Sequence, residues 1–510
     1  MKPRASFLAL CLAAAGVLFQ PASAEEITVA VGSGFTTLDP YDATDMLSRA
    51  AAKSFYEGLF TFDENMKPVP QLAQSCETSP DGLVYTIKLR PNVKFHDGTT
   101  LDAEAVKLNI DRLLDPANHL SRRTYFTPIE KVEVADPLTV RITLKHPLGT
   151  FLSRLANGTV QMVCPSLLKS GKDVAFNACG TGPYVLKEYN PSERLYVVKN
   201  PNYRVAGLPK LDGILWRPVV ENSTRAAMVR TGEAQFAHPM PAEQIKVLQN
   251  DPKIDILVQP SVIVRYLFIN NLQKPFTDVR VRQAINYAIN KEALAKVAFS
   301  GYARPVTGVV PEVFEFATKP GPWPYDPKKA RELLKEAGYP QGFETVLWSG
   351  YNNTTGQKVI QFIQQQLRQV GIRTTLRSLE AGQRVALVES VQDPMKAGMR
   401  LYYIGWSNST GEIDLAMRPL FHSESWAPAL ANEGFYKNEK VDRLLDEAIA
   451  EPDKAKRAKL YEEVQSTIWN DAPWAFLVTE DVTGASVKTL KNFRLRPDSS
   501  YDFYEAEIVK

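Results

Sequence analysis

The chain has 510 residues and a formal net charge of +3, with 60 Lys and Arg against 57 Asp and Glu. So small a net charge argues against binding to nucleic acid or to an anionic membrane surface by general electrostatic attraction. At about 150 residues per domain, the length predicts roughly three domains, each long enough for a substantial hydrophobic core.

The first 24 residues have the pattern of a signal peptide. Lys2 and Arg4 precede an apolar run over 7–19, and residues 22–24 (ASA) offer a small-residue cleavage site. The run is shorter than the roughly 20 apolar residues of a membrane span, and Cys11 lies in it without the context of a lipid-anchored cysteine. We therefore expect export to the periplasm of a Gram-negative cell, cleavage after residue 24, and no membrane anchor.

Strand and helix signals alternate along the rest of the chain, which predicts an α/β architecture with mixed sheets. The segment 46–59 predicts a helix that Asp45 caps, and a second helix is expected to begin after Thr100 or Asp102. Strands are predicted over residues 26–31, 84–89, 132–144, 184–186, 195–199 and 213–218.

The clearest helix signals lie just beyond the middle of the chain. Apolar residues at helical spacing over 281–289 predict a buried stripe, and Asn290 is placed to cap a following helix. Asp326 is a predicted N-cap, Pro327 fits the first helical position, and Gly338 ends the helix.

Three cysteines follow the predicted cleavage site: Cys76, Cys164 and Cys179. An oxidising compartment permits one disulfide, and Cys164 with Cys179 is the preferred pair because both lie on the approach to the Gly-Thr-Gly-Pro-Tyr sequence at 180–184. The alternative is that all three are small core residues. No metal site is expected, since the histidines are scattered and no zinc-type spacing occurs.

The helical segments over 281–338 and the strand–turn–helix sequence at 83–115 resemble the family 5 extracytoplasmic solute-binding proteins, the capture subunits of ABC importers for peptides, nickel and related solutes. The resemblance implies a periplasmic binding protein fold of type II (cluster C), with two lobes, an extra domain and a hinged cleft. It implies domain I from 25–57, 181–268 and 480–510, domain II from 58–180, and domain III from 269–479.

Segments 31–45, 216–237 and 404–421 narrow the resemblance to family members that capture glutathione. This implies glutathione as the ligand, the permease subunits of the importer as partners, and a monomer. Other peptides, nickel complexes, haem and opines are the alternatives within the family. Scattered histidines disfavour free nickel, and no axial pair for haem is recognisable.

One departure from the peptide-binding members concerns charge. Their third domain carries a Gly-Trp-x-x-Asp motif whose carboxylate pairs with the peptide ammonium, whereas Gly405 and Trp406 are followed here by Ser409 at the position of the acid. Burying an ammonium without a carboxylate is costly, so an ordinary α-dipeptide should bind poorly. Glu412 or Asp414 is expected to supply the missing charge.

Glutathione has two carboxylates and one ammonium, so its pocket should contain arginines that donate paired hydrogen bonds. Arg265 and Arg384 are the arginines we expect in this role; the alternatives are a structural ion pair for Arg265 and a solvated side chain for Arg384. Trp348, Tyr351 and Trp406 are the expected apolar walls, although Trp348 and Tyr351 could equally cover core. The expected hydroxyl donors are Thr36, Thr37, Ser407, Ser409 and Thr410.

The main rival of another class is a periplasmic peptide hydrolase. No GxSxG nucleophile elbow or zinc motif occurs, which disfavours a hydrolase without excluding it, because catalytic triads need not be local in sequence. The chain lacks the GxxxxGK[ST] motif for ATP and a complete dinucleotide loop, so no cofactor is expected. We therefore expect a binding protein that is not an enzyme.

Overall fold

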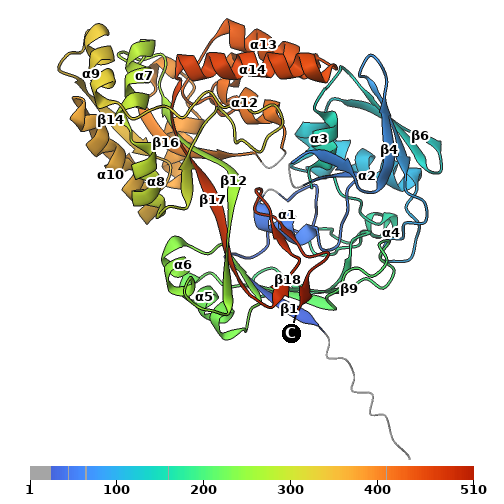
Figure 1. Ribbon diagram of the computed structural model, residues 1–510. Helices are drawn as coiled ribbons and strands as arrows, with labels where there is room; N and C mark the ends of the chain where they lie inside the picture. The colour runs from blue at the N-terminus through green and yellow to red at the C-terminus, as the bar shows by residue number, and fades with distance from the viewer. Residues whose placement is uncertain (1–24, 44, 64–65, 159, 409–410, 510) are drawn as a thin grey trace, which may run out of the picture.

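The computed structural model describes residues 25–509 apart from 44, 64, 65, 159, 409 and 410, so the predicted signal peptide lies outside it. Helices and mixed sheets alternate along the chain, which confirms the expected α/β class. Figure 1 shows domain I at the bottom, domain II at the upper right and domain III at the upper left. We use these labels with the ranges given above, and the bounds of the domains remain a prediction.

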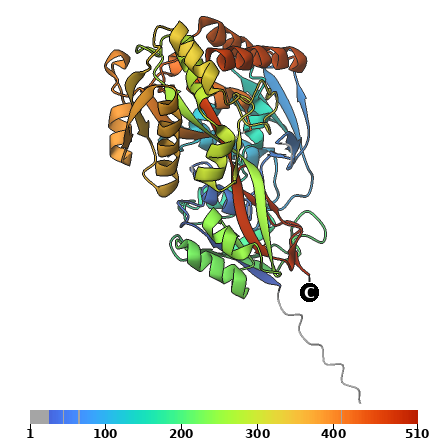
Figure 2. The same cartoon turned by 60° about the vertical axis from the view of Figure 1, so that its left-hand side comes forward.

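One large mixed sheet runs through domains I and III, in the order β15-β14-β16-β12-β17-β11-β1-β10-β9-β8, with β13 beside β17. Its strands in domain I are β1 (Glu26–Val31), β8 (Tyr184–Asn190), β9 (Arg194–Lys199), β10 (Gly213–Pro218) and β11 (Phe236–His238). Those in domain III are β13 (Ala303–Pro305), β14 (Phe343–Ser349), β15 (Ile372–Ser378) and β16 (Leu401–Ser407). The antiparallel strands β12 (Ile254–Ile269) and β17 (Trp474–Val487) pass from one domain to the other, as Figures 1 and 2 show.

The two faces of β12 serve different cores in domain III. Side chains alternate along a strand, so Val264, Tyr266 and Phe268 point to one face, where Tyr266 stacks on Trp474 with ring centroids 3.6 Å apart. Leu267 and Ile269 point to the other face and belong to a separate apolar cluster. Arg265 lies on this second face, next to Leu267, so the apolar row of this face ends at a charged side chain.

Domain II is built on a four-stranded antiparallel sheet of order β4-β5-β7-β6. Its strands are β4 (Ala73–Thr78), β5 (Val84–Leu89), β6 (Ile129–Asp136) and β7 (Thr139–Leu144), with β2 (Phe60–Phe62) and β3 (Pro68–Pro70) beside them. The single strand expected over 132–144 is therefore wrong. Pro137 interrupts it, and Asp136 accepts a hydrogen bond from the backbone N–H of Leu138 at 2.9 Å, which makes a hairpin turn.

The helices of domain II are α2 (Ala103–Leu114), α3 (Phe151–Ala156) and α4 (Pro165–Lys169). Of the two expected caps for α2, Asp102 is the observed one, and its side chain accepts from the N–H of Ala105 at 2.8 Å. Cys164 and Cys179 form a disulfide, with their Cα atoms 5.3 Å apart, and Cys76 is a half-buried free thiol.

The chain passes between domains I and II at two adjacent segments. Gly180 and Gly182 lie against the backbone of Phe55, where added Cβ atoms would come within 2.2 Å and 2.6 Å of it. This crossing corrects the helix expected over 46–59: α1 is Met46–Ala52, capped by Asp45, and the chain then leaves the helix to pack on the glycines. Tertiary contact therefore shortens the helix that the apolar pattern predicted.

Domain III carries the helices with the clearest sequence signals. Asn290 caps α8 through the N–H of Ala293 at 2.9 Å, and Asp326 caps α9 through the N–H of Lys329 at 2.9 Å. Gly338 follows α9 with a positive φ of 90°, as its expected role requires. The helices are α7 (Val279–Ala288), α8 (Lys291–Phe299), α9 (Pro327–Glu336), α10 (Thr354–Gln369), α11 (Ala381–Arg384), α12 (Ile413–Phe421), α13 (Glu439–Ala450) and α14 (Lys454–Asp471).

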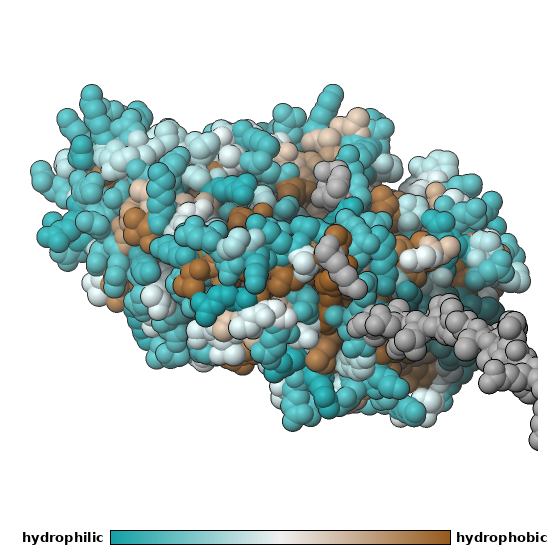
Figure 3. Space-filling view, turned by 60° about the horizontal axis from the view of Figure 1, so that its bottom comes forward, coloured by the Kyte–Doolittle hydropathy of each residue, from teal (hydrophilic) through white to brown (hydrophobic). Residues whose placement is uncertain are grey.

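Domain I is completed by α5 (Asn222–Thr231), α6 (Ala242–Leu248) and short strands near the end of the chain. Figure 3 shows the underside of the molecule, where hydrophilic residues dominate and hydrophobic ones appear mainly in recesses between them. Within the described part of the chain, no helix combines the length and apolar character that crossing a membrane requires.

Candidate ligand-binding site

A cavity of about 430 Å³ lies where domain I meets the strands that lead to domain III. Its walls include Ser33, Asp45, His238, Ile263, Glu480 and Tyr501. Ser33 and His238 come at the carboxyl ends of the parallel strands β1 and β11, the edge at which open α/β sheets bind ligands. The volume falls within the about 300–1000 Å³ typical of small-molecule sites.

The cavity wall carries little positive charge of its own. Burial lowers the pKa of His238 to about 4, and its Nδ1–H donates to the carbonyl oxygen of Thr483 at 3.0 Å, so the ring is neutral near pH 7. Asp45, Glu480 and Asp481 add carboxylates to the same wall. Two arginines beside this wall, Arg265 and Arg304, pair with its carboxylates Glu480 and Asp481.

Arg265 is the more buried of these two arginines. Its Nη2 donates to Oε2 of Glu480 at 2.8 Å, and its Nη1 donates to the hydroxyl of Tyr351, whose ring lies 4.7 Å from the guanidinium carbon. Burial lowers the pKa of Arg265, but the Glu480 carboxylate together with Tyr351 and Tyr403 raises that pKa above its ordinary value. The guanidinium is thus charged at every accessible pH.

Gly405 allows this arrangement. It faces Arg265 across the β12–β16 pair, and a Cβ at position 405 would lie only 2.4 Å from Nη1 of Arg265. The glycine of the Gly-Trp sequence is therefore needed for space, because the arginine side chain lies directly over it. Two residues that the sequence predicted for the site, Arg265 and Tyr351, are in direct contact; their role in ligand binding stays a prediction.

Trp406 and Ser407 end β16 at the same boundary between domains. Trp406 packs on the apolar cluster that includes Val264 and Trp474, and its indole N–H is buried with no hydrogen-bond partner among the described residues. Ser407 is exposed and pairs with Ile263, a residue of the cavity wall. Ser409 and Thr410, also predicted for the site, lie outside the described residues.

The two acids expected to replace the missing aspartate already have arginine partners. Glu412 is fully buried and accepts from Nε of Arg154 at 2.9 Å, which joins domain III to α3 of domain II. Asp414 is also buried and accepts from Nε of Arg418 at 2.9 Å. Neither acid is part of the cavity wall.

Arg384 and Trp348 do not line the cavity. Arg384 pairs with Glu389 at 2.7 Å, and neither lines the cavity. Trp348 is only 7% exposed, and the guanidinium of Arg377 lies 5.3 Å from its ring centroid, as the alternative of a core-covering residue predicted. Nearby, burial and the charge of Glu389 raise the pKa of Glu433 to about 8.

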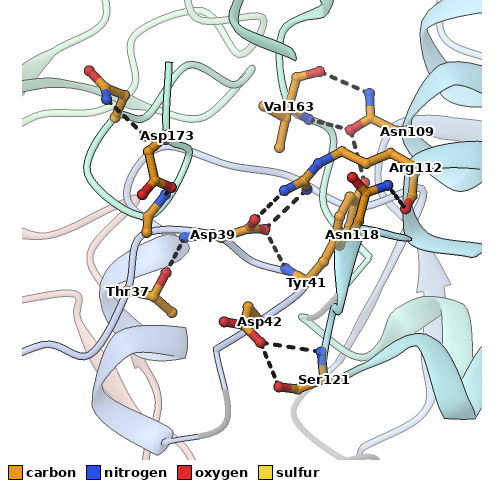
Figure 4. Close-up of polar contacts among 12 residues, drawn as sticks. Thr37, Asp39, Tyr41, Asp42, Asn109, Arg112, Asn118, Ser121, Val163 and Asp173 are labelled. Carbon is orange, nitrogen blue, oxygen red and sulfur yellow. Dashed lines mark hydrogen bonds and ion pairs between the residues drawn. The ribbon is translucent and has the colours of Figure 1, made fainter. Parts of the chain in front are cut away.

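Thr36 and Thr37 have local hydrogen bonds. The Thr36 hydroxyl donates to Asp45, the N-cap of α1, while the buried Thr37 hydroxyl accepts from the backbone N–H of Asp39 at 3.0 Å. Figure 4 shows that Asp39 in turn holds Arg112 of α2, so Thr37 belongs to a polar network between domains I and II.

Glu480, the acid that holds Arg265, was not predicted from the sequence. Its only available signal was its position one residue after the predicted return from domain III to domain I, where hinge strands border the cleft. Its distance of 215 positions from Arg265 hid the pairing.

Residues 67–428 match the family model of the bacterial extracellular solute-binding proteins, family 5 middle region. The chain is 50% identical over 506 residues to the glutathione-binding protein GsiB of Escherichia coli O1:K1, covering 99% of each chain. It is 51% identical over 489 residues to GsiB of Pectobacterium atrosepticum, covering 96% of this chain and 95% of the relative.

Among solved structures, the periplasmic binding protein DppA of Helicobacter pylori, in complex with the peptide STSA, superposes with a TM-score of 0.75 at 28% identity. The match covers 95% of this chain and 98% of that one. The expected binding-protein fold of type II is thereby confirmed. The chain belongs to the bacterial extracellular solute-binding proteins of family 5.

Proposed function

We propose that this chain captures glutathione in the periplasm and delivers it to the membrane permease of an ABC importer. The observation that carries the proposal is the identity of about half of all positions, over nearly the whole chain, with relatives named as glutathione-binding proteins. The alignment covers 99% of the chain and therefore spans the segments around the cavity.

Three further observations support this ligand. An arginine at the edge of the cavity suits a ligand with two carboxylates, since guanidinium donors pair with carboxylate oxygens. The Gly-Trp sequence also lacks the aspartate of the peptide-binding members, which disfavours ordinary α-dipeptides. A cavity of about 430 Å³ provides the space for a small peptide.

Capture proceeds by closure of the cleft. Domain III lies on one side, domains I and II lie on the other, and the β12–β17 pair connects them. A ligand that contacts both sides stabilises the closed form, and the closed surface then docks on the permease. The protein acts as a monomer that a signal peptide directs to the periplasm, and it binds its ligand without chemical change.

Calorimetric titration of ligand-free protein tests the proposal. Reduced glutathione should bind with a stoichiometry of one and a Kd of about 1 μM, or about −8 kcal/mol. Ala-Ala, which lacks the γ-linkage, should bind at least about 100-fold more weakly, and a nickel–histidine complex should give no heat. Equal affinity for Ala-Ala and glutathione would overturn the choice of ligand, and cleavage products in excess of the protein would show an enzyme instead.

A further inference from the structure

The ion pair of Arg265 and Glu480 has unused hydrogen-bonding capacity beside the cavity. Each terminal nitrogen of an arginine carries two hydrogens, and only one contact from each is made here, to Tyr351 and to Glu480. Nε of Arg265 is buried with no hydrogen-bond partner among the described residues. Oε1 of Glu480 likewise has none within the described part of the chain, and Glu480 lines the cavity.

The two side chains are also partly accessible. Arg265 is 16% exposed and Glu480 is 22% exposed, so a ligand can reach both while most of the water around them is already excluded. Partial desolvation strengthens the interaction of such charges with a ligand relative to that of exposed surface charges. Gly405, which has no side chain, leaves the guanidinium room to occupy this position.

We propose that this pair recognises an α-amino-acid head group, with Glu480 accepting hydrogen bonds from its ammonium and Arg265 donating to its carboxylate. The inference rests on the proposed function, because it assigns the γ-glutamyl end of glutathione to the pair. It places the missing ammonium partner on β17, rather than in the Gly-Trp segment or at Glu412 or Asp414.

The charge and the spacing of the pair match those of such a head group. The pair is neutral as a whole, and its cation and anion are adjacent, so it complements a head group whose ammonium and carboxylate share one carbon. In an α-linked dipeptide the ammonium and the carboxylate lie at opposite ends of the molecule, and both cannot meet adjacent partners. The hydroxyl of Tyr351 accepts from Arg265 and keeps its own proton for the ligand carboxylate.

The test compares Glu480→Gln with the wild-type protein on two probes, glutathione and its desamino analogue glutaryl-Cys-Gly, which lacks only the ammonium. The variant should bind glutathione roughly 10- to 100-fold more weakly, the loss of a hydrogen bond between charged groups, and should bind the analogue as the wild type does. The matched control is Glu233→Gln, which removes another acid paired with an arginine, at 2.6 Å from Arg217 and outside the cavity. It should change neither affinity.

The outcomes separate the possibilities. An equal loss of affinity for both probes would show that Glu480 only positions Arg265, and no loss for either would show that it is not at the site; both results overturn the inference alone. If the wild type fails to bind glutathione, the proposed function and the inference fail together. If circular dichroism shows that the variant does not fold, the wild-type protein alone still tests the inference. Equal affinity of the wild type for glutathione and for the desamino analogue would contradict an ammonium partner.

Discussion

The buried ion pair of Arg154 and Glu412 should contribute strongly to the association of domains II and III. Arg154 donates to Glu412 from Nε at 2.9 Å and from Nη2 at 3.4 Å, and its Nη1 donates to the carbonyl oxygen of Tyr125 at 2.9 Å. The two side chains are 9% and 0% exposed. Burial raises the pKa of Glu412 and the arginine opposes this shift, so the carboxylate depends on its partner for stabilisation.

Glu412→Gln removes the negative charge and leaves Arg154 buried without it. Breaking a buried pair from one side costs about 3–5 kcal/mol, so we expect the free energy of unfolding to fall by about 3 kcal/mol, given that Gln still accepts a hydrogen bond. The double replacement of Arg154 and Glu412 by Met leaves no buried charge, and it should cost less than the single change.

Urea unfolding followed by circular dichroism measures both effects. The control is Glu447→Gln, which breaks an exposed pair with Arg443 at 3.5 Å and should change stability by less than about 0.5 kcal/mol. A double variant that is less stable than Glu412→Gln would refute the reasoning, as would a Glu412→Gln variant as stable as the control.

Three further predictions concern other parts of the chain. Gly405→Ala should displace Arg265 and weaken glutathione binding at least about 10-fold in calorimetry while the protein stays folded; unchanged affinity would show that the arginine position does not matter. Burial lowers the pKa of Lys291 to about 7. Between about pH 7 and pH 10 the unfolded chain therefore binds more protons at this group than the folded chain does, so the stability that the group contributes rises with pH. Lys291→Met should flatten that rise in thermal melts, and an unchanged slope would contradict the lowered pKa. Replacing Cys164 and Cys179 by Ser should lower the free energy of unfolding by about 3 kcal/mol, as expected for a closed loop of 15 residues, and denaturation curves that coincide with the wild type would exclude this contribution.

Local signals made parts of the fold predictable. Asp326 and Gly338 begin and end α9 as the capping preferences indicate, because both act within a few residues of the helix. The end of α1 was missed, since Phe55 leaves the helix to contact Gly180 and Gly182 far along the chain. Capping is encoded locally, whereas that contact depends on the assembled domains.

The same distinction applies to the site. Arg265 and Tyr351 were both expected at the site, and the structure brings them together, but nothing in the sequence indicated their contact. Glu412 was expected at the ligand because of its position after the Gly-Trp sequence; its arginine partner lies 258 positions away and could not be read from the chain. Glu480 was missed for the same reason.

A crystal structure of the protein with glutathione would test the central claim most directly. The account predicts one glutathione in the cleft between domain III and domain I, with its γ-glutamyl carboxylate on Arg265 and its ammonium on Glu480. A structure with the ligand at another surface, or a cleft that stays empty at saturating glutathione, would contradict it.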